Sequence, residues 1–97
     1  MRKRGRVDAN QEAIVAALRK IGCTVAILSP VGGGVPDLLV GFRGKTFLLE
    51  VKDYAQPPSK RRLTPDEQLF FDVWNGGELR IVDSPISAVN AVTLPAT

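Results

Sequence analysis

The chain opens with helical spacing of its apolar residues and then changes to short continuous apolar runs. Apolar residues recur at intervals of three and four, which is the spacing of one helix face, at Ile14, Ala17, Leu18 and Ile21. We expect this helix to begin near Ala9 with Asp8 as its cap, and to end at Gly22. Residues 23–28 are rich in Val, Ile and Leu, which predicts a strand. We expect its Cys23 to be a buried core residue.

Two further strands follow a glycine-rich segment. Residues 29–34 (Ser-Pro-Val-Gly-Gly-Gly) predict a turn that serves as a flexible connector, with close approach of the backbone to a ligand as the alternative role. Residues 38–42 and 46–51 are apolar runs joined by Arg43-Gly44-Lys45, and so short a connection predicts an antiparallel hairpin. Because both runs are continuous rather than alternating, we expect central strands that are covered on both faces.

The second half of the chain carries clear helix starts. Residues 54–63 contain two prolines and three consecutive basic residues, which predicts an exposed loop. Thr64-Pro65-Asp66-Glu67 matches a capping box with proline at the first helical position. The apolar face of this helix would be formed by Leu69, Phe70, Val73 and Trp74.

A short strand over 79–82 and a last helix from Ser84-Pro85 complete the predicted order α-β-β-β-α-β-α. This order predicts one small α/β domain over 1–97, with a mixed sheet flanked by helices. We expect its core to span about 8–94 and residues 1–7 to form a basic N-terminal arm.

Charge favours a polyanionic partner. The formal net charge is +3, with an isoelectric point of about 9.4. The basic residues gather in two segments, and the residues that we expect to contact nucleic acid are Arg2, Lys3, Arg4, Arg6, Lys60, Arg61 and Arg62. The alternative is that these basic segments are solvated and bind no nucleic acid. No apolar run is long enough to span a bilayer or to form a secretory signal, so we expect no membrane partner and a cytoplasmic location.

The residues available for chemistry are few. The chain has no histidine and one cysteine, which excludes histidine-based catalysis and Cys/His metal sites. A metal here would need oxygen ligands, which points to Mg²⁺ or Mn²⁺. Asp37 begins one predicted strand, while Glu50 and Lys52 share one face of the next. A bound divalent ion would relieve repulsion between the two carboxylates; an exposed ion pair between Glu50 and Lys52 is the alternative.

These residues resemble a nuclease signature. Pro36-Asp37, followed by Glu50-Val51-Lys52, resembles the PD-(D/E)XK motif. The fuller set resembles the VRR-NUC (virus-type replication-repair nuclease) branch, and it consists of Glu12 in the first helix, residues 34–38 (Gly-Val-Pro-Asp-Leu), residues 49–52 (Leu-Glu-Val-Lys), residues 63–65 (Leu-Thr-Pro) and Gln68.

The resemblance implies a restriction-endonuclease-like core and a Mg²⁺-dependent endonuclease in which Mn²⁺ can substitute. The implied metal ligands are Glu12 (directly or through water), Asp37, Glu50 and the backbone carbonyl of Val51. The implied catalytic residues are Asp37, Glu50, Lys52 and Gln68, with Gln68 facing the active site from the second helix.

The resemblance also implies a substrate class. Stand-alone members of this family, typical of phages and bacteria, resemble archaeal-type Holliday junction resolvases and work as homodimers, and a chain of 97 residues looks like this kind. We therefore expect a homodimeric, structure-selective endodeoxyribonuclease acting on branched DNA in a bacterial or phage-infected cell. The alternatives are a flap or nicking nuclease of the same family, a catalytically idle DNA-binding module, and a structural subunit.

Overall fold

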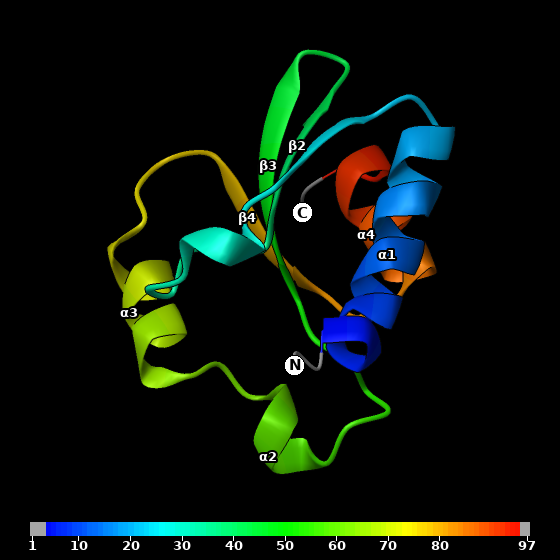
Figure 1. Ribbon diagram of the computed structural model, residues 1–97. Coiled ribbons are helices and arrows are strands. Elements are labelled where there is room, and N and C mark those ends of the chain that lie inside the picture. The colour runs from blue at the N-terminus through cyan, green and yellow to red at the C-terminus, as the bar shows by residue number, and fades with distance from the viewer. Residues whose placement is uncertain (1–3, 96–97) are drawn as a thin grey trace.

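The computed structural model describes the backbone of residues 4–95 and the side chains of residues 9–95. In chain order its elements are helix α1 (Arg4–Lys20), strand β1 (Thr24–Ile27), the 3₁₀ turn η1 (Ser29–Val31), strands β2 (Leu38–Phe42) and β3 (Lys45–Val51), helices α2 (Pro58–Arg61) and α3 (Pro65–Val73), strand β4 (Glu78–Val82) and helix α4 (Pro85–Thr93) (Figure 1).

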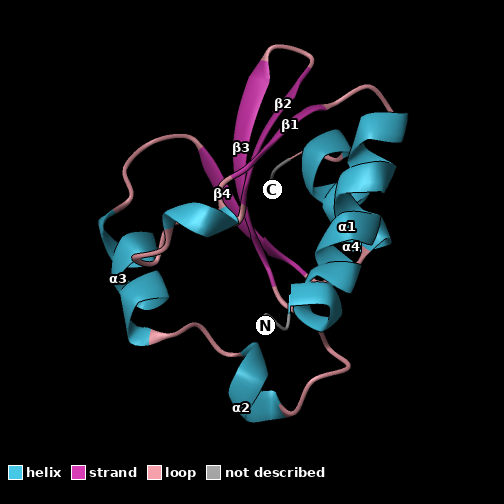
Figure 2. Ribbon diagram, viewed as in Figure 1, coloured by secondary structure: helices cyan, strands magenta, loops and turns pink. Residues whose placement is uncertain are grey.

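The four strands form one mixed sheet in the order β1-β2-β3-β4 (Figure 2). Strand β2 is antiparallel to both of its neighbours, β1 and β3, whereas β4 is parallel to β3 and follows the crossover through α2 and α3. The turn between β2 and β3 consists of Arg43 and Gly44, whose φ angles are 52° and 81°. Two consecutive left-handed residues give the twist that a two-residue hairpin needs. The predicted hairpin is therefore confirmed, with Lys45 in the strand rather than in the turn.

The hydrophobic core lies between one face of the sheet and the layer formed by α1 and α4, which pack against each other (Figures 1 and 2). Alternate residues of the central strands point to this face because side chains on a strand alternate between faces. The buried residues of this core include Ile14, Leu18, Leu38, Val40, Phe47, Leu49, Ala88 and Val92. Cys23 belongs to the same core and is a free thiol, as predicted.

The opposite face of the sheet is covered incompletely. Helix α3 lies on this side (Figure 1), yet Leu69 and Val73 on it are 60% and 64% exposed. On the strands, Leu39 is 38% and Ile81 is 51% exposed. The expectation that both hairpin strands are covered on both faces is therefore wrong for β2. It is confirmed for β3, where Leu48 and Glu50 on this face are 8% and 2% exposed. The predicted apolar face of α3 is largely open.

Two element boundaries also differ from the predictions. Helix α1 begins at Arg4 rather than near Ala9, so residues 4–7 belong to the helix and Asp8 lies inside it. No proline interrupts these residues, so the helical run continues past the expected cap. The expected loop over residues 54–63 contains the short helix α2, because Pro58 occupies the first helical position, where its missing N–H breaks no hydrogen bond. Within residues 4–95, no helix is long and apolar enough to cross a membrane.

Candidate functional site

The hairpin brings the two carboxylates of the predicted site together. Leu38 of β2 is paired with Leu49 of β3, and both side chains point into the core. The residues next to this pair, Asp37 and Glu50, therefore lie side by side on the other face of the sheet. Asp37 Oδ2 accepts the backbone N–H of Val51 at 2.8 Å. The approach of Asp37 to Glu50 that the strand pattern predicted is confirmed.

The second oxygen of Asp37 is held by the segment that precedes it. Ser29 Oγ, at the start of η1, lies 3.1 Å from Asp37 Oδ1 and 3.1 Å from Gln11 Oε1 on α1. Both carboxylate oxygens of Asp37 thus have a partner in the fold, which fixes the orientation of the carboxylate. Each oxygen keeps a further lone pair that can accept a ligand.

Glu50 is the most unusual group of the site. Its side chain is 2% exposed, and its Oε1 is buried without a hydrogen-bond partner. Burial raises the pKa of Glu50 to about 9, and the negative charges of Asp37 and Glu67 add to this effect, although the charge of Lys52 opposes it. A buried polar atom without a partner is costly in a folded protein, so a cation bound at Oε1 would be favourable.

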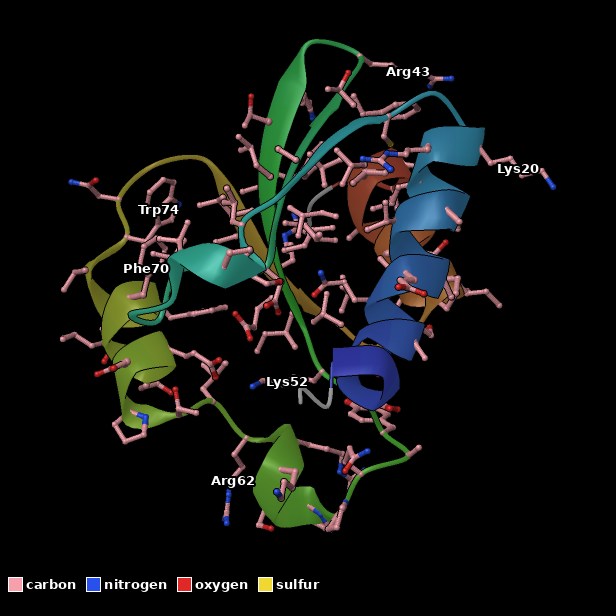
Figure 3. All side chains as sticks on the ribbon, in the orientation of Figure 1. Lys20, Arg43, Lys52, Arg62, Phe70 and Trp74 are labelled. Carbon is pink, nitrogen blue, oxygen red and sulfur yellow. The ribbon has the colours of Figure 1, made fainter. Side chains whose placement is uncertain are left out.

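Lys52 lies between two carboxylates. Its Nζ is 2.8 Å from Glu67 Oε1 and 3.6 Å from Glu50 Oε2. Burial by itself would lower the pKa of Lys52, but the hydrogen bond and charge of Glu67, followed by those of Glu50, outweigh it and raise this pKa. Figure 3 shows the amine of Lys52 turned toward α3, in the space framed by α1, α2 and α3.

These groups line a cleft of about 580 Å³. Its lining residues are Asn10, Gln11, Asp37, Glu50, Val51, Lys52, Asp53, Gln56, Lys60 and Glu67. Asn10 fixes α1 to the ends of two strands, since its Nδ2 donates to the carbonyls of Lys52 at 3.1 Å and Asp83 at 3.2 Å. The cleft therefore has walls from α1, α2, α3 and the ends of β2 and β3.

Two residues implied by the family resemblance lie away from this cleft. Glu12 is exposed and does not line it, whereas its neighbour Gln11 does. Gln68 is exposed and its amide donates to Asp72 at 2.9 Å, whereas its neighbour Glu67 lines the cleft. In both helices the residue at the site is therefore the one directly before the expected one. A one-residue shift turns a side chain by about 100° around a helix.

The basic residues of the second cluster point in different directions. Lys60 lines the cleft. The guanidinium of Arg61 sits over the ring of Tyr54, 5.1 Å from its centroid. Figure 3 shows the side chain of Arg62 directed away from Lys52. The predicted contacts at Arg2 and Lys3 lie outside the described residues, and Arg4 and Arg6 are described by their backbone only.

The donors at the site fit a hard divalent ion. The two carboxylates of Asp37 and Glu50 and the carbonyl of Val51 are all oxygen donors, and Glu50 Oε1 is orphaned among them. Over the described part of the chain, no three Asp, Glu, His or Cys side chains form a group that could hold a metal ion. A bound ion would therefore need the carbonyl, water or a substrate oxygen as its remaining ligands.

The sequence predicts Glu67 only as part of a capping box and Ser29 only as part of a turn, and it assigns no role to Gln11. The sequence signal for Glu67 is that it is an acid at the third position of a helix in a chain whose Glu-x-Lys segment offers a basic partner. Comparison of the chain with protein-family models, with curated proteins and with solved structures gives no match.

Proposed function

We propose that the protein is a Mg²⁺-dependent endodeoxyribonuclease with a PD-(D/E)XK core of the VRR-NUC type. The observation that carries this proposal is the buried carboxylate of Glu50, whose Oε1 has no partner, beside Asp37 and Lys52 in one cleft. The ion pair with Lys52 involves only Oε2, so Oε1 keeps a free position at which a cation would be favourable.

In the proposed site, Asp37, Glu50 and the carbonyl of Val51 would hold the ion. When bound, Mg²⁺ supplies a Lewis acid for a phosphate oxygen and an activated water. The ammonium of Lys52 orients this water and neutralises charge that develops on the phosphate. The raised pKa of Lys52 favours this role over that of a base, because the amine keeps its proton near neutral pH.

The proposed substrate is branched DNA. Lys60 lies in the cleft, where it would bind a phosphate next to the scissile one. The N-terminal basic segment and the remaining residues of the second cluster would contact phosphates farther along the strand, without reading sequence. A homodimer with two-fold symmetry would cut a four-way junction at two related positions, in the cytoplasm of a bacterial or phage-infected cell.

The test is cleavage of four-way junction, flap, nicked and linear duplex DNA in the presence of Mg²⁺. We expect cleavage of at least one branched substrate by wild type, and a loss of at least about a hundredfold, typical for removal of a group that stabilises the transition state, in Asp37→Asn and Lys52→Met. Glu12→Gln is the matched control, and we expect it to keep its activity because Glu12 is exposed outside the cleft. Size-exclusion chromatography with light scattering tests the dimer.

Each alternative predicts a different result in the same assays. A catalytically idle module binds junctions but does not cleave them with Mg²⁺ or Mn²⁺. A structural subunit does not bind DNA even at low salt, where phosphate contacts are strongest. A nuclease of the flap or nicking type cleaves those substrates faster than the four-way junction. Undiminished cleavage by Asp37→Asn would overturn the proposed site.

A further inference from the structure

Glu67 is the nearest partner of the proposed catalytic lysine. Its Oε1 lies 2.8 Å from Lys52 Nζ, whereas the closest atom of Glu50 lies 3.6 Å away. Both side chains of the closer pair are largely buried, with 10% of Lys52 and 19% of Glu67 exposed. An ion pair with so little solvent contact is weakly screened. The position of the ammonium is therefore set first by Glu67.

The fold holds Glu67 in place by two independent contacts. Its Oε1 also accepts the backbone N–H of Thr64 at 2.8 Å, as the third residue of the capping box of α3. The first turn of α3 presses against the glycine-rich segment, where a Cβ added to Gly34 would clash with the carbonyl oxygen of Asp66. The carboxylate of Glu67 is thus presented by a fixed helix start.

Without Glu67, the ammonium of Lys52 would have only the proposed metal ligands as partners. Lys52 Nζ and Glu50 Oε2 already form a longer ion pair at 3.6 Å, and a small rotation of the long side chain would shorten it to a direct hydrogen bond. Such a pair would occupy a carboxylate that a divalent ion requires. Lys52 and the ion would then compete for Glu50.

We propose that Glu67 is a positioning residue whose shorter pair with Lys52 keeps the ammonium from a direct hydrogen bond with Glu50, and so leaves Glu50 free for a divalent ion. This inference rests on the proposed function for its metal, but the pairing of Glu67 with Lys52 does not. In this proposal Glu67 acts through Lys52 and is not itself a ligand of the ion. Its effect should therefore disappear when Lys52 has no charge.

A double-mutant cycle tests this by measuring Mg²⁺ affinity with isothermal titration calorimetry, in the absence of DNA. We expect Glu67→Gln to weaken Mg²⁺ binding at least about threefold, the lower end of couplings between contacting residues. In a Lys52→Met background, we expect the same substitution to leave the affinity unchanged. Glutamine can keep the capping box, so α3 should still begin at the same residue.

The matched control is Asp66→Asn, which removes the same charge one residue earlier on the exposed side of α3. We expect no change in Mg²⁺ affinity from it. An equal weakening by Glu67→Gln in the wild-type and the Lys52→Met backgrounds would overturn the inference, because Glu67 would then act on the ion directly through its charge. A loss of equal size in Asp66→Asn would overturn it as well.

A metal-free measurement separates this inference from the proposed function. The ¹⁵Nζ signal of Lys52 reports its ion pair, and we expect Glu67→Gln to shift it while Asp66→Asn does not. An unshifted signal overturns the pairing. If wild type binds no Mg²⁺, the proposed function and the metal part of the inference both fail, and the ¹⁵Nζ measurement alone decides the pairing.

Discussion

Replacement of Glu50 by glutamine should stabilise the metal-free protein at neutral and alkaline pH. The folded protein raises the pKa of this carboxyl from its ordinary value of 4.5 to about 9. The folded state therefore binds the proton more tightly than the unfolded state. The stability that this proton contributes is fully present below pH 4.5 and is lost as the pH rises toward 9.

The size of this change in stability follows from the difference between the pH and the ordinary pKa of Glu50. Each pH unit in this window favours the unfolded state by up to about 1.4 kcal/mol. At about three units above the ordinary value, the cost reaches about 4 kcal/mol. Glutamine has the same shape but no proton to lose, so it removes this cost. Because its amide still needs a partner near the orphaned oxygen, which costs about 1–3 kcal/mol, we expect a net gain of at least about 1 kcal/mol.

Urea denaturation in EDTA at pH 5 and at pH 8 measures the difference. We expect Glu50→Gln to be no more stable than wild type at pH 5, where the cost of the amide is at least as large as the cost of losing the proton, and more stable than wild type at pH 8. Glu12→Gln is the control, because Glu12 is exposed on α1. A variant that is no more stable than wild type at pH 8, with the same dependence on pH, would refute the reasoning.

Three further predictions follow from other contacts of the fold. Mg²⁺ binding at neutral pH should release close to one proton, because the ion must displace the proton of Glu50; calorimetry in buffers of different ionisation enthalpy measures this number, and no release would contradict the assignment. Gly34→Ala should cost at least about 1–3 kcal/mol in urea denaturation, because its φ is +87° and its Cβ would clash with α3; Gly33→Ala, with φ +67° and open space, should cost less. Leu38→Ala should cost about 2–5 kcal/mol because Leu38 is fully buried, whereas Leu39→Ala on the open face should cost much less, and equal losses would contradict the described core.

The hairpin and the pairing of Asp37 with Glu50 were predictable from the sequence because both depend on local rules. A connection of two or three residues forces antiparallel neighbours, and a period of two then decides which side chains share a face. The start of α3 was predictable for a similar reason. The capping box and Pro65 act within one turn of the helix and need no tertiary contact.

The rotation of the helices toward the cleft was not predictable in the same way. Whether Gln11 or Glu12, and whether Glu67 or Gln68, faces the site depends on how α1 and α3 dock, and the sequence pattern does not encode that angle. The apolar stripe of α3 showed that the helix is amphipathic but not what covers it, and Leu69 is mostly exposed. The nuclease activity and the family stay predictions.

Trp74 gives the protein a natural optical reporter of the helix that carries Glu67. It is the only tryptophan of the chain, it follows the last residue of α3, and its ring stacks on Phe70 with centroids 5.5 Å apart. Figure 3 shows both rings at the end of α3 away from Lys52. Since the indole is only partly shielded from water, a movement of α3 that changes its contact with water would change its emission. Fluorescence can therefore follow, in the unlabelled wild-type protein, whether α3 moves when ions or DNA are added.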